Sequence, residues 1–127
     1  MLMIGFINGL LGAVAGSHDN HGLICFELVS IGVIGIALSL PLIAGKVEMN
    51  KSYGIRIAKA YKSLENWYAL NKYGGKVMTG WSVVLLLLAP LAVMFKENRA
   101  VQTWLVYGPA LYVFAMAQIY WFARKLP

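Results

Sequence analysis

The chain has 127 residues, of which 60% are hydrophobic and 13% are charged. Soluble domains carry about 25% charged residues. This composition, with a mean hydropathy of +0.67, therefore excludes an ordinary soluble protein and indicates an integral membrane protein. The net charge is +6, and in so apolar a chain we assign the basic excess to membrane topology and expect no nucleic-acid partner. The single cysteine, Cys25, excludes an intrachain disulfide.

The first apolar run covers residues 2–16. It is shorter than the roughly 20 residues that a transmembrane helix needs, and it lacks the basic start and the cleavage site of a secretory signal. We expect an interfacial helix, a re-entrant piece or a short fourth span. Behind it, His18, Asp19 and His21 form an H-D-x-H pattern. These side chains are candidate metal ligands, but a third or fourth ligand of defined geometry is missing, so we expect no metal and no cofactor.

Three runs are long enough to cross a bilayer: residues 23–45, 77–95 and 103–123. The predicted fold is therefore a single, all-α membrane domain with three transmembrane helices. Glu27 is the one formal charge in these runs. It lies about a turn inside the first run, where it either reaches the outer interface or, if buried, marks an ion or proton site. Gln118 in the third run could form a hydrogen bond across helices.

The segment 46–76 holds seven of the 11 basic residues, against only two acids, Glu48 and Glu65. Because basic loops stay on the cytoplasmic side, we expect this segment to be cytoplasmic. The basic pair Arg124 and Lys125 then returns to the same side.

The same segment is patterned like an amphipathic helix. Ser63 is a typical N-cap residue, and Glu65 falls in the first turn, where the helix dipole favours an acid. Large side chains and one amide then recur at spacings of three and four: Leu64, Trp67, Tyr68 and Asn71. Such a helix could lie on anionic lipid headgroups with Trp67 and Tyr68 at headgroup depth. The alternative is a solvated basic loop that only obeys the topology rule.

The order and spacing of polar residues in this segment resemble the signature of the SdpI family of small bacterial membrane proteins. The residues that carry the resemblance are Asn50, Tyr53, Gly54, Arg56, Ser63, Glu65, Trp67, Asn71 and Gly75. The match covers about residues 23–95. The chain departs from the family pattern at Ile57, where threonine is frequent, and at Leu64, where proline is frequent.

The resemblance implies a role in immunity or signalling. The named member of the family protects a spore-forming bacterium from its own secreted toxin, and it holds a repressor at the membrane. Two other classes stay open: a structural or accessory subunit of a larger membrane complex, and a transporter or channel in which Glu27 would be essential. The partners could be other membrane subunits or further copies of the same chain. No nucleophile with a base, paired carboxylates or phosphate-binding loop is evident, so we expect no enzymatic activity.

The signature also suggests a polar site. Gly54 permits a tight bend, and the five donors of Arg56 suit a phosphate or a carboxylate. We hypothesise that Arg56, Asn50 and Asn71 together bind a lipid headgroup or a partner protein at the inner membrane face. The alternative is that these three residues only fasten the loop to the helices.

Overall fold

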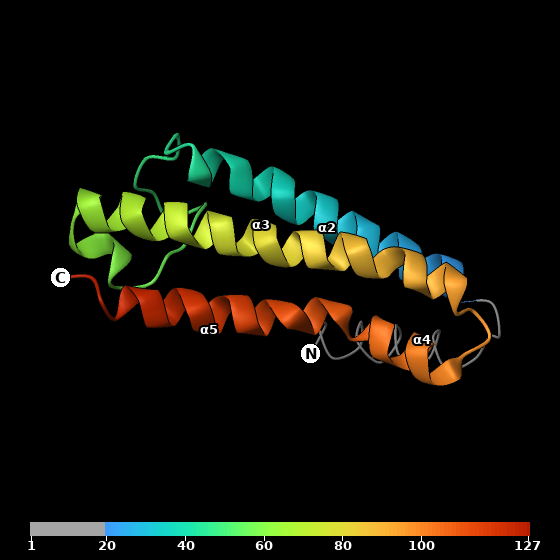
Figure 1. Ribbon diagram of the computed structural model, residues 1–127. Helices are drawn as coiled ribbons and strands as arrows, with labels where there is room; N and C mark the ends of the chain where they lie inside the picture. The colour runs from blue at the N-terminus through green and yellow to red at the C-terminus, as the bar shows by residue number, and fades with distance from the viewer. Residues whose placement is uncertain (1–19) are drawn as a thin grey trace, which may run out of the picture.

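The computed structural model describes residues 20–127, and it shows helices joined by short loops (Figure 1). The elements are α2 (His21–Ile43), the 3-10 turn η1 (Ala60–Lys62), α3 (Leu64–Met94), α4 (Arg99–Val106), the 3-10 turn η2 (Gly108–Leu111) and α5 (Tyr112–Ala123). Over this range there is no strand, which confirms the all-α prediction there. The apolar run 2–16, together with His18 and Asp19, lies outside the described residues.

Within the described range, two helices are long and apolar enough to cross a membrane, namely α2 and α3. A third crossing is possible if α4 and the segment Gly108–Ala123, which meet at an angle of 49°, form one broken span. The predicted run 103–123 is thus not one straight helix. Pro109 accounts for the break, because proline lacks the N–H that a helix interior needs. The helices have the character expected of a membrane protein.

The structure has no helix boundary at residue 76, where the predicted basic segment ends and the next apolar run begins. Helix α3 runs without interruption from Leu64 to Met94, over 31 residues, or about 46 Å at 1.5 Å per residue. That length exceeds the roughly 30 Å of the hydrocarbon core. The start of α3, in the amphipathic segment, and the following apolar run are therefore two parts of one helix that is longer than the hydrocarbon core of a bilayer is thick.

Small residues allow α2 and α3 to pack at close range. Gly32, Gly35 and Ser39 are all buried on one face of α2. A Cβ atom added at Gly32 would lie 2.8 Å from Leu86 Cγ, and one at Gly35 would lie 2.3 Å from Ser82 Oγ. This face of small residues on α2 therefore packs against α3 of the same chain. Helix α5 packs on the opposite side of α3, so α3 is the central helix (Figure 1).

A glycine terminates α2 and starts the loop that leads to α3. Gly45 has a φ of +66°, and the amides of Gly45 and Lys46 donate to the carbonyls of Leu42 (3.2 Å) and Pro41 (3.0 Å). This is the Schellman arrangement, in which a residue with positive φ satisfies the last carbonyls of a helix. It turns the chain back toward α3.

Candidate functional site

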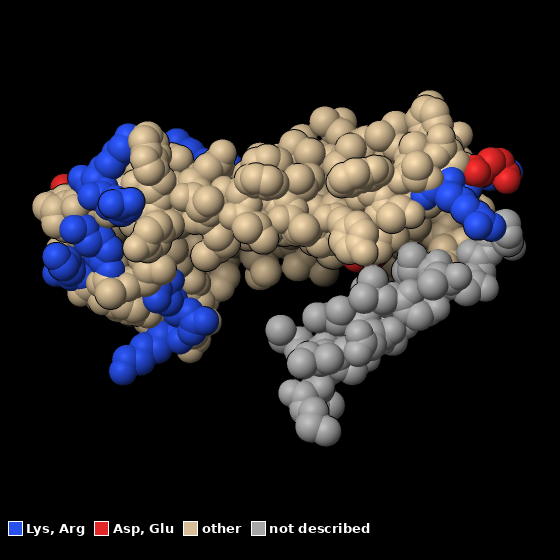
Figure 2. Space-filling view, turned by 90° about the horizontal axis from the view of Figure 1, so that it is seen from below, with Lys and Arg blue, Asp and Glu red and all other residues tan. Residues whose placement is uncertain are grey.

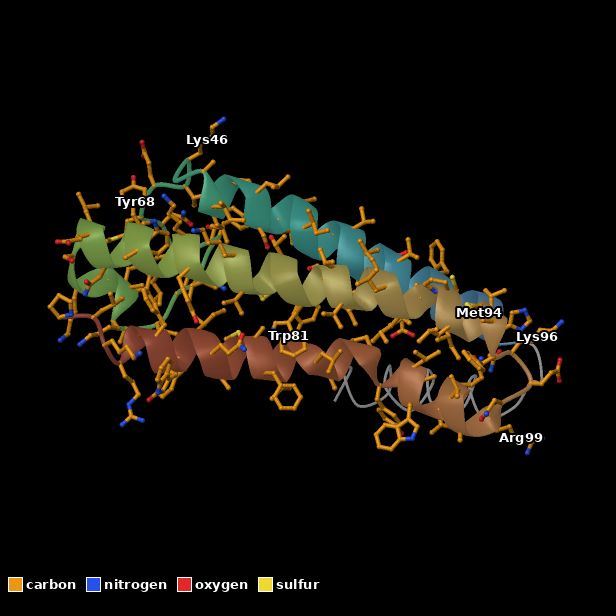
Figure 3. The ribbon with its side chains drawn as sticks, in the orientation of Figure 1. Lys46, Tyr68, Trp81, Met94, Lys96 and Arg99 are labelled. Carbon is orange, nitrogen blue, oxygen red and sulfur yellow. The ribbon has the colours of Figure 1, made fainter. Side chains whose placement is uncertain are left out.

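Basic side chains gather at one end of the helical bundle, while the long middle of the visible face is almost free of charge (Figure 2). We call this the basic end. It is formed by the loop after α2, the first turns of α3 and the C-terminus, and its residues are Lys46, Lys51, Arg56, Lys59, Lys62, Lys72, Lys76, Arg124 and Lys125. The opposite end carries Lys96, Glu97 and Arg99. Figure 3 shows Lys46 pointing away from the bundle at one end, and Lys96 and Arg99 at the other.

Asn50 folds the first part of the loop into an Asx turn. Its Oδ1 accepts hydrogen bonds from the amides of Ser52 (2.8 Å) and Tyr53 (2.7 Å), and its Nδ2 donates to the carbonyl of Glu48 (2.7 Å). The Asn50 carbonyl in turn accepts a hydrogen bond from the Tyr61 hydroxyl at 2.8 Å. Every polar group of this side chain is therefore engaged by the chain itself.

Asn71 holds the second part of the loop. It is 2% exposed, and its Oδ1 accepts from the amide of Ile55 (2.5 Å) while its Nδ2 donates to the carbonyl of Trp67 (2.9 Å). Gly54, just before Ile55, has a φ of +108°, and a Cβ atom there would lie 2.5 Å from Asn71 Oδ1. Only glycine fits this bend, because the asparagine must come close enough to reach the next amide.

Trp67 is the centre of a small apolar core at the basic end. Its side chain is completely buried with Ala60, Leu70 and Ile119, and its Nε1 donates to the carbonyl of Val47 at 2.8 Å. Trp67 is therefore covered by the chain itself and is not exposed to lipid headgroups. The loop folds over the tryptophan and hides it, a tertiary contact that helical spacing alone could not reveal.

The N-terminus of α3 agrees with its sequence signals. Ser63 is the N-cap, and its Oγ accepts from the amide of Asn66 at 3.0 Å. Glu65 is exposed in the first turn. Further along, Gly75 lies against α2, and a Cβ atom there would be 2.9 Å from Ile43 Cγ1. These three signature residues therefore start α3 and pack it against α2.

Asn66 is a structural residue that the sequence reasoning missed. It is 2% exposed, and its Nδ2 donates to the carbonyls of Lys59 (3.2 Å) and Pro127 (2.9 Å). This amide fastens both the chain before η1 and the C-terminal residue to α3. A polar residue within the apolar stripe of a helix is the signal that could have drawn attention to it.

Arg56 differs from the two asparagines, because it is exposed and lines an open cavity. The cavity has a volume of about 430 Å³ and is lined by Lys51, Arg56 and Tyr61. One guanidinium nitrogen of Arg56 donates to the main-chain carbonyl of Lys51. The structure thus separates Arg56 from Asn50 and Asn71, whose amides are used inside the loop.

The polar residues of the predicted spans, Glu27 and Gln118, lie in different helices. Trp81 Nε1 donates to Gln118 Oε1 at 3.2 Å, which links α3 to α5 (Figure 3). Glu27 is half-buried in α2, and His21 is the first residue of that helix. Among residues 20–127 there is no group of three or more His, Cys, Asp or Glu side chains that could hold a metal ion.

The comparisons with known proteins give one match. The family model described as the SdpI/YfhL protein family matches residues 46–123, which is more than half of the chain and includes the loop, α3, α4 and α5. No curated protein and no solved structure matches the chain. The match covers the whole polar signature, from Asn50 to Gly75. The chain therefore belongs to the SdpI/YfhL family of membrane proteins.

Proposed function

We propose that the chain is a small immunity or signalling protein of the bacterial cytoplasmic membrane, and that its basic end captures a cytoplasmic protein with an acidic surface. The observation that carries this proposal is the charge distribution. Nine of the 11 basic residues lie at the basic end, and among residues 20–127 no ion pair neutralises any of them. A cationic surface attracts an acidic partner and raises its rate of association.

The fold of the loop supports the same proposal. Asn50, Asn71 and Trp67 fix the loop against α3 through hydrogen bonds to main-chain atoms. A loop that is ordered before binding loses less conformational entropy when a partner docks. This part of the family signature then has a clear purpose, since Asn50, Gly54 and Asn71 hold the loop in one conformation.

A structural or accessory subunit of a larger membrane complex is the second candidate. The arrangement of the helices favours it, because α2 and α5 pack on different sides of α3 and each leaves a face that no other described helix covers (Figure 1). Large apolar side chains face outward from both outer helices, among them Phe26 (71% exposed) and Phe114 (59% exposed). Lipid or a neighbouring subunit could cover these faces.

Deleting the gene and complementing it separates the two candidates. The strains carry the wild-type chain, a variant with Lys46, Lys51, Lys59 and Lys62 changed to glutamine, or a control with Lys96 and Arg99 changed to glutamine. Survival is measured in medium conditioned by stationary cells that secrete peptide toxins, and capture of the cytoplasmic partner is measured by its co-purification with the chain. We expect the deletion strain to be sensitive, the wild type and the control to restore resistance, and the basic-end variant to lose capture of the cytoplasmic partner. Normal survival of the deletion strain, with co-purification of membrane subunits at fixed stoichiometry, would favour the accessory role instead.

A further inference from the structure

We propose that the cavity lined by Lys51, Arg56 and Tyr61 binds a phosphate group, carried by the headgroup of an anionic lipid. The inference goes beyond the proposed immunity or signalling role and does not depend on it. It concerns the open surface cavity of about 430 Å³, and not the general positive charge of the basic end.

The chemistry of the lining favours a phosphate. The guanidinium of Arg56 uses one nitrogen to donate to the Lys51 carbonyl, which fixes its orientation and leaves other N–H groups for a ligand. Lys51 lines the same cavity and carries a second positive charge. Within residues 20–127 neither cation forms an ion pair, so both charges are available. A guanidinium matches the oxygens of a phosphate in a two-point contact, and an ammonium adds a second charge.

Tyr61 acts as the wall of the cavity. Its hydroxyl donates to the carbonyl of Asn50 at 2.8 Å, and its ring packs against Trp67 with the ring centroids 5.5 Å apart. The tyrosine is therefore fixed by two contacts, one to the loop and one to α3. Because its proton is committed to Asn50, the donors for a phosphate come from Arg56 and Lys51, and the ring gives the cavity a rigid apolar side.

The position of the loop favours a lipid as the source of the phosphate. The Tyr53 hydroxyl donates to the carbonyl of Leu38, which lies in α2 before its last residue, Ile43. This contact holds the loop beside the last turns of a helix that is long and apolar enough to cross a membrane. The polar headgroup layer lies directly outside the hydrocarbon core, at the level where such a helix ends.

Two variants of equal charge test the cavity. Lys51→Gln removes the ammonium but keeps the main-chain carbonyl that Arg56 uses, so it leaves the contact within the loop intact. Lys72→Gln removes the same charge from an exposed residue of α3 at the same end, so the general attraction between the basic end and anions falls equally in both. We expect Lys51→Gln to weaken phosphate binding about fivefold more than Lys72→Gln, because only Lys51→Gln also removes a direct contact between the ammonium and the phosphate.

The experiment has two arms that identify the source of the phosphate. In the first, inorganic phosphate is titrated into the full chain in detergent without lipid. In the second, the full chain is placed in nanodiscs, and bound phosphatidylglycerol is counted by native mass spectrometry against a phosphatidylcholine background. A difference between Lys51→Gln and Lys72→Gln in the nanodiscs supports a lipid. A difference that is seen only with inorganic phosphate would support a phosphate site but would contradict a lipid headgroup as its ligand. Equal behaviour of the two variants in both arms overturns the proposal.

Arg56 variants separate binding from fastening of the loop. We expect Arg56→Lys to bind phosphate more weakly than the wild type, because the two-point contact is lost, while its unfolding midpoint stays the same. Unchanged phosphate binding together with a lowered unfolding midpoint would show that Arg56 only fastens the loop, and this result would overturn its role as a ligand.

Discussion

Asn71→Ala tests the central argument about how the loop is built. The substitution removes the oxygen that accepts from the Ile55 amide at 2.5 Å and the nitrogen that donates to the Trp67 carbonyl at 2.9 Å. A main-chain amide left buried without a partner costs about 1 to 3 kcal/mol. With the small loss of packing around a side chain that is 2% exposed, we expect the free energy of unfolding to fall by about 2 to 3 kcal/mol.

The assay is unfolding by sodium dodecyl sulfate in mixed micelles, followed by far-ultraviolet circular dichroism. Lys72→Ala, an exposed change at the next residue of α3, is the matched control and should stay within about 0.5 kcal/mol of the wild type. If Asn71→Ala changes the free energy of unfolding no more than this control does, the loop is not held by Asn71 and the reasoning fails.

A double-mutant cycle adds a second check on the same contact. Gly54→Ala should cost about 2 kcal/mol on its own, because alanine is strained at a φ of +108° and its Cβ would lie 2.5 Å from Asn71 Oδ1. In the Asn71→Ala background that oxygen is absent. The two changes should therefore destabilise the protein by about 1 kcal/mol less together than the sum of the single changes. Strict additivity would contradict the close approach of the two residues.

Three further predictions concern packing, capping and topology. Gly75→Val should destabilise the protein by about 1 to 3 kcal/mol, because its Cβ would lie 3.0 Å from the Ser39 carbonyl oxygen; Gly80→Ala, with open space around its Cβ, should be neutral or slightly stabilising in the same unfolding assay. Ser63→Ala removes the N-cap hydrogen bond of α3 and should lower the free energy of unfolding by about 1 kcal/mol in that assay; an unchanged value would mean that the cap is dispensable. Ser52→Cys in a Cys25→Ser background should be protected from a membrane-impermeant maleimide in intact cells and labelled after lysis, because the basic loop is expected in the cytoplasm; labelling in intact cells would reverse the topology.

The predictions made from hydropathy and local signals agree with the structure where short-range physics decides the outcome. An N-cap serine, an acid in the first turn and a long apolar run are enough to start α3 at Leu64. Pro109 is enough to break the last helical segment. The family resemblance also rests on local information. The polar signature from Asn50 to Gly75 lies within one continuous segment, so the order of its residues is visible in the sequence without any knowledge of contacts.

Hydropathy, charge and the polar signature were enough to predict the class of protein, the apolar runs that form helices and the family. Hydrophobic length and charge asymmetry are properties of single segments, and they need no tertiary information. Only the tertiary structure decided the roles of the polar residues. Trp67 is covered by the loop. The side chains of Asn50 and Asn71 accept hydrogen bonds from main-chain amides. Arg56 instead lines a cavity with Lys51 and Tyr61. The physical reason is that burial and hydrogen bonding between Ile55 and Asn71, 16 residues apart, depend on how the loop folds against α3, which no local pattern specifies.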